Sequence, residues 1–304
     1  MSIVDPKSGP VEYRWFEPPC AIGEPPVVLL HEGLGSLKMW RDFPAQLADS
    51  TQRRVLAYSR RGYGDSPPLG RRRSVSYMHE EALHHLPELL DELNVVRPVL
   101  FGHSDGASIA LIHAGAQVRP VSALILEAPH VFVEDISVQS IRAAKVAYES
   151  GDLRERLSRY HGDVDGAFYG WNDIWLSSEF RSWNIENYLA SLKCPVLAIQ
   201  GMDDEYGTLE QIDRIARAHA DTVLLKLRDC GHSPHRDQLQ RVLRSVESFL
   251  GRPPSVGAGE ALNRSPGTEP TIAAQAPIQS GDIKSPSPEL AEREPEGGSS
   301  SKLP

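Results

Sequence analysis

Cysteine is scarce in this chain, and long apolar runs are absent. The three cysteines, Cys20, Cys194 and Cys230, are an odd number and lie far apart, which argues against a disulfide scaffold and a zinc site. This usage fits a reducing compartment, so we expect a cytoplasmic protein. No run of about 18 apolar residues is present, so we expect no transmembrane helix. The polar, proline-containing residues 1–10 do not resemble a secretory signal.

Basic residues are also in the minority. Lys and Arg number 32 against 41 Asp and Glu, which gives a net charge of −9 at pH 7. An acidic chain is a poor candidate for nucleic-acid binding, because the phosphate backbone selects basic surfaces. We therefore expect a small-molecule substrate as the partner, with no nucleic acid and no membrane. The sequence is silent on the oligomeric state.

Aromatic residues are missing from the end of the chain. Residues 253–304 contain nine prolines, six glycines and no aromatic side chain. Such a segment cannot bury enough apolar surface to offset its conformational entropy, so we predict a disordered tail. The folded part is therefore expected within residues 1–252.

Short apolar runs alternate with longer helical patterns in this folded part. The runs read as buried strands at residues 27–31, 54–58, 98–102, 122–127, 195–201 and 222–227, with a leading edge strand at 11–16. Apolar residues at helical spacing occur at residues 77–93, 104–116 and 209–219, and a closing helix is expected at 238–250. This alternation predicts an α/β fold with a mostly parallel sheet flanked by helices.

Residues 130–192 break the alternation. They show helical patterning without a clear strand and contain three of the five tryptophans, Trp171, Trp175 and Trp183. We predict a helical insertion that lies over one edge of the sheet. The chain then divides into a core of residues 1–129 and 193–252, a cap of residues 130–192, and the tail.

A G-x-S-x-G motif occupies residues 102–106, after a predicted strand and at the start of a predicted helix. This context is typical of a nucleophile elbow, with Ser104 as the nucleophile. The sharp turn needs small residues on both sides, which Gly102 and Gly106 supply. The helix N-terminus at Ser104 also favours developing negative charge.

A serine hydroxyl is a weak nucleophile and needs an adjacent base. His232 follows the last predicted strand, so it is expected at the same edge of the sheet as Ser104, whereas five of the other ten histidines fall on predicted helices. His235 lies a turn later and fits a supporting role. The orienting carboxylate is expected after the strand at 195–201, where the candidates are Asp203, Asp204 and Glu205.

Five motifs in this order resemble the α/β-hydrolase superfamily, in its capped serine-hydrolase type. They are residues 31–36 (HEGLGS), 59–66 (SRRGYGDS), 102–106 (GHSDG), 201–204 (GMDD) and 230–235 (CGHSPH). The resemblance implies the α/β-hydrolase fold, with a helical cap inserted after the sixth strand. It selects Asp204 as the acid, because this family usually places the acid three residues after the strand-ending glycine. Ser104 argues against epoxide hydrolases and haloalkane dehalogenases, which carry Asp at the elbow.

The resemblance also implies an oxyanion hole built from backbone N–H groups. One donor is Asp105, and the other is Gly33 or Leu34 in the loop after the strand at 27–31. The family commonly has glycine after the histidine of this loop, whereas this chain has Glu32. We expect the Glu32 side chain to point away, because its charge would oppose an oxyanion.

Asp105 and two cap tryptophans are the candidate substrate contacts. The Ser-Asp-Gly sequence at residues 104–106 resembles the valacyclovir-hydrolase-like or biphenyl-hydrolase-like branch, in which a carboxylate at Asp105 would bind an ammonium. The alternative is that Asp105 caps its own helix. Trp171 and Trp175 are expected to line the pocket or to pack within the cap. Glu127, at the end of the strand at 122–127, is the reserve acid.

These residues predict a serine hydrolase that cleaves a small carboxylic ester, lactone or thioester through an acyl-enzyme intermediate. Two alternatives stay open. A member of the meta-cleavage hydrolase-like branch would use the same triad on a carbon–carbon bond. A non-catalytic ligand-binding protein would use the scaffold without turnover. The chemistry of the triad requires no metal and no cofactor.

Overall fold

The computed structural model describes residues 2–21, 23 and 25–251. Within them, eight strands form one sheet in the order β1-β2-β4-β3-β5-β6-β7-β8. The strands are β1 (Ser2–Val4), β2 (Val11–Phe16), β3 (Val27–Leu30), β4 (Val55–Tyr58), β5 (Val99–His103), β6 (Ala123–Glu127), β7 (Val196–Gly201) and β8 (Thr222–Leu227). β2 pairs antiparallel with β1 and β4, and β3 to β8 run parallel.

The sheet confirms the predicted α/β fold, with one correction at its edge. All seven predicted strands are present, each within one residue of its expected ends. The strand at 11–16 was expected at the edge but lies second, because β1 pairs along it. β1 has only three residues, too few to show an alternating pattern in a sequence. β3 to β6 are buried along their whole length, which explains their uninterrupted apolar character.

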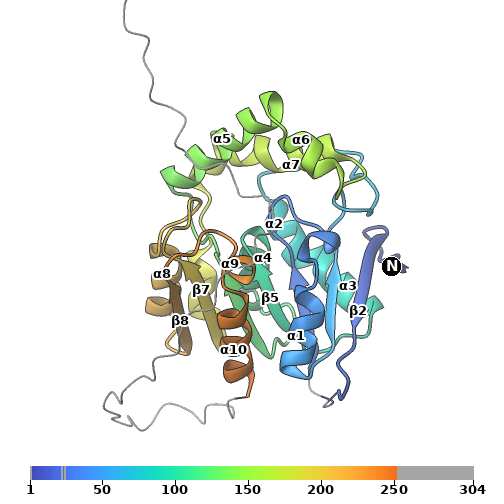
Figure 1. The fold of residues 1–304 in the computed structure, drawn as a ribbon, viewed down its shortest axis with the longest axis vertical. Helices are drawn as coiled ribbons and strands as arrows, with labels where there is room; N and C mark the ends of the chain where they lie inside the picture. The colour runs from blue at the N-terminus through green and yellow to red at the C-terminus, as the bar shows by residue number, and fades with distance from the viewer. Residues whose placement is uncertain (1, 22, 24, 252–304) are drawn as a thin grey trace, which may run out of the picture.

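Helices cover both faces of the sheet. One face carries α1 (Phe43–Thr51) and α10 (Leu239–Leu250), which lie side by side on the near side of the sheet in Figure 1. The other face carries α3 (Leu86–Glu92), α4 (Asp105–Gly115) and α8 (Glu210–Ala218). The shorter helical segments are η1 (Leu37–Trp40), α2 (Tyr77–Glu80), η2 (Glu81–His85) and α9 (Pro234–Asp237).

A helical layer covers one end of the sheet. Its main members are α5 (Asp135–Ser150), α6 (Leu153–Ser158) and α7 (Val164–Trp175), followed by the short segments η3 (Glu179–Ser182) and η4 (Glu186–Ser191). All five lie between β6 and β7 in the chain, so the insertion follows the sixth strand, as expected. In Figure 1, α5, α6 and α7 arch over the strands. We call these three helices, with the turns between them, the cap.

The carboxyl ends of the parallel strands meet beneath the cap. Ser104 follows β5, Asp204 follows β7 and His232 follows β8. In an open parallel sheet, residues that follow neighbouring strands share one edge, which is where ligands bind. Helix α5 reaches this edge, because Ser137 donates a hydrogen bond to the carbonyl of Tyr206.

Two further expectations concern other parts of the chain. The predicted disordered tail, residues 253–304, lies outside the described residues and stays a prediction. Among the described residues, no helix combines the length and the apolar character needed to cross a membrane.

Candidate active site

Ser104 occupies a sharp turn between β5 and α4. Its backbone lies at φ 53° and ψ −120°, a region that side-chain-bearing residues rarely adopt. A Cβ on Gly102 would lie 2.4 Å from the Cα of Ala107. A Cβ on Gly106 would lie 2.1 Å from the carbonyl oxygen of Leu30. The turn therefore admits only glycine at positions 102 and 106 on either side of Ser104, and its strained conformation is the one expected of a nucleophile elbow.

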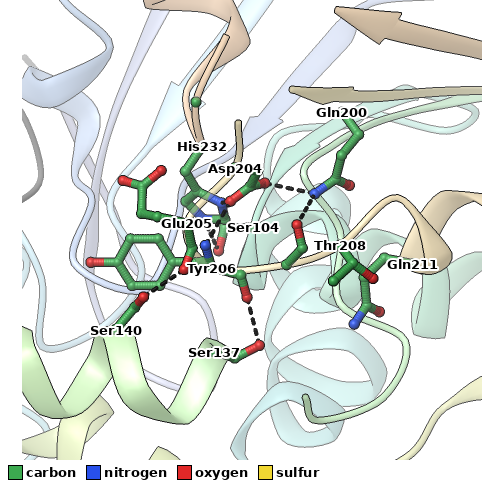
Figure 2. A network of polar contacts seen from close by, with 12 residues as sticks. Ser104, Ser137, Ser140, Gln200, Asp204, Glu205, Tyr206, Thr208, Gln211 and His232 are labelled. Atoms are coloured by element: carbon green, nitrogen blue, oxygen red, sulfur yellow. Dashed lines mark hydrogen bonds and ion pairs between the residues drawn. The ribbon is translucent and has the colours of Figure 1, made fainter. Parts of the chain in front are cut away.

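Three side chains from separate loops form one line of hydrogen bonds. His232 Nε2 lies 2.9 Å from Ser104 Oγ. His232 Nδ1 lies 2.8 Å and 3.0 Å from the two carboxylate oxygens of Asp204. An ionised carboxylate only accepts, so Nδ1 carries the ring proton and Nε2 accepts from the serine hydroxyl. Figure 2 shows these three side chains converging.

The carboxylate of Asp204 is buried and held on both oxygens. Gln200 Nε2 donates to Oδ2 at 2.6 Å, and the backbone N–H of Tyr206 donates to Oδ1 at 2.8 Å. Asp203, the neighbouring candidate, is exposed. Of the two aspartates, the structure therefore brings Asp204 to the histidine.

The cap helps to hold the loop that carries the acid. In Figure 2, Ser137 and Ser140 project from α5 toward this loop. Their hydroxyls donate to the carbonyls of Tyr206 and Glu205, each at 2.5 Å. The ring of Tyr206 in turn lies 4.7 Å from the ring of His232. Cap and acid loop are therefore one connected unit.

The pKa values of the pair shift in opposite directions. Burial works against ionisation of Asp204, but the charge and hydrogen bond of His232 prevail and lower the pKa of Asp204. Burial likewise opposes protonation of His232, but the Asp204 charge prevails and raises the pKa of His232. Burial and the His232 charge lower the pKa of His130 to about 3, so this neighbouring ring is neutral at pH 7. Of these two rings, His232 is therefore the one whose raised pKa favours accepting a proton.

The backbone N–H groups of Gly33, Leu34 and Asp105 have no hydrogen-bond partner among the described residues. Asp105 begins α4, where the first N–H groups have no acceptor within the helix. In the loop after β3, the carbonyl of Glu32 accepts from Arg60 Nη2 at 2.8 Å. A trans peptide directs its N–H opposite to its carbonyl, so this bond turns the Gly33 N–H away from Arg60.

The side chain of Glu32 is engaged by two partners. Its Oε2 lies 3.5 Å from His103 Nδ1, and its Oε1 lies 3.8 Å from Arg236 Nη2. Burial works against ionisation, but His103 and Arg236 hold the pKa of Glu32 well below its usual range. The positive charge of Arg236 therefore offsets part of the negative charge that would oppose an oxyanion.

The side chain of Asp105 takes a role that differs from both expectations. The carboxylate is fully buried, and one of its oxygens accepts from the Tyr77 hydroxyl. Trp175 Nε1 donates to the same hydroxyl at 3.1 Å. The expected capping of its own helix is wrong, because Asp105 makes no such bond and Ser104 occupies the cap position. The other carboxylate oxygen has no hydrogen-bond partner among the described residues, but Asp105 has no exposed surface at which an ammonium could reach it.

The two expected tryptophan contacts are buried near the candidate site. Trp171 lies against the loop after β3, since a Cβ on Gly33 would come 2.1 Å from the indole Nε1. The ring of Trp175 lies 5.0 Å from that of His130. Trp183 packs with them in the same apolar core. Trp171 is therefore a cap side chain that lies against the candidate oxyanion loop.

A second buried pair lies behind His232. His235 Nδ1 lies 2.5 Å from Glu127 Oε2, so the reserve acid contacts His235 and not His232. His103 Nε2 donates to the carbonyl of His232 at 2.7 Å. His103, Glu127 and His235 offer atoms within 4.8 Å of one another that could hold a metal ion. Glu127 Oε2 contacts His235 and His103 Nε2 contacts the His232 loop, while His103 Nδ1, Glu127 Oε1 and His235 Nε2 are buried without a hydrogen-bond partner among the described residues.

Sequence reasoning missed three residues beside the site: Tyr77, His161 and Gln200. A polar side chain at the end of a buried apolar strand is itself a signal, and it would have found Gln200. Tyr77 and His161 carry no local signal, because their partners Asp105 and Leu34 lie 28 and 127 residues away in the chain.

Comparison with known proteins shows the family of this chain. Residues 27–245 match the family described as "Alpha/beta hydrolase family". This chain belongs to the alpha/beta hydrolase family. The matched region runs from β3 into α10 and contains the cap and all three members of the hydrogen-bond line. The expected superfamily and fold class are thereby confirmed.

Similar proteins span several activities. The dihydrolipoyllysine-residue acetyltransferase component of the acetoin cleaving system of Pseudomonas putida is 31% identical over 151 residues, which cover 49% of this chain and 39% of that protein. The sn-1-specific diacylglycerol lipase ABHD11 of Mus musculus is 24% identical over 260 residues, with 74% and 81% covered. The crystal structure of the enol-lactonase from Burkholderia xenovorans LB400 matches with a TM-score of 0.63 at 19% identity, covering 83% of this chain and all of that one. The last similarity shows the fold alone.

Proposed function

We propose that this protein is a serine hydrolase that cleaves a small carboxylic ester, lactone or thioester through an acyl-enzyme intermediate. The observation that carries the proposal is the line of hydrogen bonds from the strained Ser104 through His232 to Asp204, with lengths of 2.9 Å and 2.8 Å. A serine hydroxyl becomes nucleophilic when an adjacent base removes its proton, and that base must be held in the correct tautomer. This arrangement supplies both requirements.

In the first step, Ser104 Oγ attacks the carbonyl carbon of the substrate while His232 Nε2 takes the hydroxyl proton. Asp204 holds the ring and stabilises the imidazolium, as the raised pKa of His232 and the lowered pKa of Asp204 favour. His232 then gives the proton to the leaving alcohol as the ester bond breaks. The acyl group stays on Ser104.

Backbone N–H groups of Asp105 and of Gly33 or Leu34 bind the oxyanion in this step. Donors that are held in position before substrate binds need no reorganisation, and each contributes roughly 10²–10³ in rate. Water then attacks the acyl carbonyl as His232 takes its proton. The acid leaves, and the proton returns to Ser104.

An uncharged acyl group suits the surroundings of Ser104. Asp105 and Glu32, the acidic groups beside the N–H donors, have partners of their own. Trp171 lies against the loop of Gly33 and supplies aromatic character on the cap side, whereas Trp175 is fully buried behind it. The name of one similar protein, a diacylglycerol lipase, agrees with this substrate class.

Turnover of p-nitrophenyl acetate and labelling by a fluorophosphonate probe test the proposal. The probe phosphonylates a reactive serine oxygen and releases fluoride. Ser104→Ala should abolish both labelling and turnover. Ser122→Ala is the control, because its hydroxyl bonds the Arg97 carbonyl and lies before β6, at the end of this strand away from Ser104. Undiminished turnover in Ser104→Ala would refute the proposal.

Other outcomes would favour the alternatives. Labelling of Ser104 without turnover across an ester panel, together with cleavage of a meta-cleavage dienoate, would indicate carbon–carbon bond hydrolysis. Tight ligand binding with neither labelling nor turnover would indicate a non-catalytic protein.

A further inference from the structure

His161 joins the cap to the loop that carries Gly33 and Leu34. It lies between α6 and α7, and it is buried. Its Nδ1 accepts from the Gly64 N–H at 3.0 Å, and its Nε2 lies 2.9 Å from the Leu34 carbonyl oxygen. The next residue, Gly162, donates to the Gly64 carbonyl at 2.9 Å. One imidazole of the cap thus bridges two loops of the core.

The partners of His161 determine its tautomer. A backbone N–H can only donate, so Nδ1 must present its lone pair to Gly64. A carbonyl can only accept, so Nε2 must carry the proton that bonds Leu34. The neutral Nε2–H form alone makes both bonds. Burial lowers the pKa of His161, although the nearby charges of Glu32 and Asp65 act in the opposite direction, so the neutral form prevails at pH 7.

The Leu34 carbonyl is the second of two anchors on this loop. The first is the Glu32 carbonyl, which accepts from Arg60 Nη2 at 2.8 Å and from the Gly35 N–H at 3.1 Å. The Gly33 N–H belongs to the first anchored peptide group, and the Leu34 N–H belongs to the peptide group between the two anchors. Fixing a carbonyl on each side restricts the rotation of both N–H groups, so the two anchors together set their direction.

We propose that His161 is a positioning residue that holds the N–H groups of Gly33 and Leu34 in the direction needed to bind an oxyanion. The inference rests on the proposed function for the role of those N–H groups. The anchor on Glu32 comes from the core itself, whereas the anchor on Leu34 comes from the cap. The core also holds the Leu34–Gly35 peptide group through the Gly35 N–H, and His161 adds the contact through which the cap acts on that group.

Two substitutions separate the two hydrogen bonds of the ring. In His161→Gln, the amide nitrogen takes the place of Nε2, so the donor to Leu34 is kept and the acceptor for Gly64 is lost. In His161→Asn, the amide oxygen takes the place of Nδ1, so the acceptor for Gly64 is kept and the donor to Leu34 is lost. Each variant loses one buried hydrogen bond, so we expect similar decreases in Tm. A difference in activity between them then has a cause other than stability.

Steady-state kinetics with p-nitrophenyl acetate compares the variants. We expect kcat of His161→Asn to fall about 10- to 100-fold with KM little changed, and kcat of His161→Gln to stay within about 3-fold of the wild type, since misdirecting a donor costs less than removing it. The control is His219→Asn, whose ring bonds the Cys194 carbonyl before β7 at 3.0 Å and whose loss should leave kcat unchanged. Equal decreases in kcat for the two His161 variants, or a change confined to KM, would overturn the proposal.

Hydrogen exchange gives a readout that needs no turnover. We expect the amides of residues 33–37 to exchange faster in His161→Asn than in His161→Gln, because only the first variant frees the Leu34 carbonyl. Equal exchange in both variants overturns the inference even if the wild type hydrolyses esters. Loss of turnover in Ser104→Ala separately tests the proposed function, so the two failures are distinguishable.

Discussion

Alanine at position 33 should disturb the cap, although the backbone there would accept it. Gly33 does not have a positive φ, so Ala brings no backbone strain. The obstacle is Trp171, because the added Cβ would lie 2.1 Å from the indole Nε1, 2.4 Å from Cδ1 and 2.8 Å from Cε2. These separations are far inside van der Waals contact. Either the loop or the cap tryptophan has to move.

The size of the effect follows from what holds Trp171. The side chain is buried, with 6% of its surface exposed, and its ring lies 6.2 Å from that of Phe168 on the same helix. Overpacking a well-packed site costs about 1–3 kcal/mol. This free energy destabilises the conformation in which the cap packs against the loop. At about 1.4 kcal/mol per factor of ten, we expect kcat/KM to fall roughly 5- to 150-fold.

A double-mutant cycle isolates this contact. Trp171→Ala removes the ring, so adding Gly33→Ala should cost little more, and the coupling energy should be about 1–3 kcal/mol. Gly35→Ala is the matched control, because its Cβ would instead meet the Glu32 carboxylate at 2.3 Å. The cost of Gly35→Ala should therefore be the same with or without Trp171. Measurements of kcat/KM with p-nitrophenyl acetate give the coupling energy. Additive effects of Gly33→Ala and Trp171→Ala would refute the reasoning.

Three further predictions address the acid, the buried tyrosine and the pH dependence of stability. Asp204→Asn should lower kcat about 10⁴-fold at unchanged near-UV circular dichroism, because the ring loses the partner that sets its tautomer; a loss under tenfold would contradict this role. Tyr77→Phe should lower the free energy of unfolding by about 1–3 kcal/mol in urea titrations, because the buried Asp105 carboxylate loses its donor, and Asp105→Asn should restore part of it. Burial lowers the pKa of His31 and His130, so below about pH 6.5 the unfolded state binds more protons than the folded state, and each ring should lower the free energy of unfolding by up to about 1.4 kcal/mol per pH unit toward pH 5. Urea titrations at pH 7.5 and 5.5 measure this change, and equal stability at the two pH values would contradict it.

The nucleophile turn could be predicted from sequence because its cause is local. Gly102 and Gly106 are needed by backbone atoms within a few residues, or in the adjoining strand, and the strand-to-helix change is visible in the pattern around them. The same holds for the strands themselves, since a run of buried β-branched and leucine side chains has few alternatives. The placement of Asp204 and His232 at the edge shared with Ser104 then follows from the parallel order of β5, β7 and β8.

Other features had no such signal. β1 is held by backbone pairing with β2, and three residues carry too little side-chain pattern to reveal it. The carboxylate of Asp105 was expected to meet a ligand or its own helix, but it meets Tyr77. Glu32 contacts His103 and Arg236, which lie far from Glu32 and from each other in the sequence.

The sequence by itself therefore determined the sheet, the elbow and the order of the three residues that the hydrogen-bond line joins. Only the tertiary structure decided which partner each buried polar group has, and with it the link from the cap through His161 to Leu34. The physical reason is that turns and strands depend on the sterics and burial of neighbouring residues. A buried polar atom, by contrast, must be satisfied by whichever group the packing brings to it, at any separation along the chain.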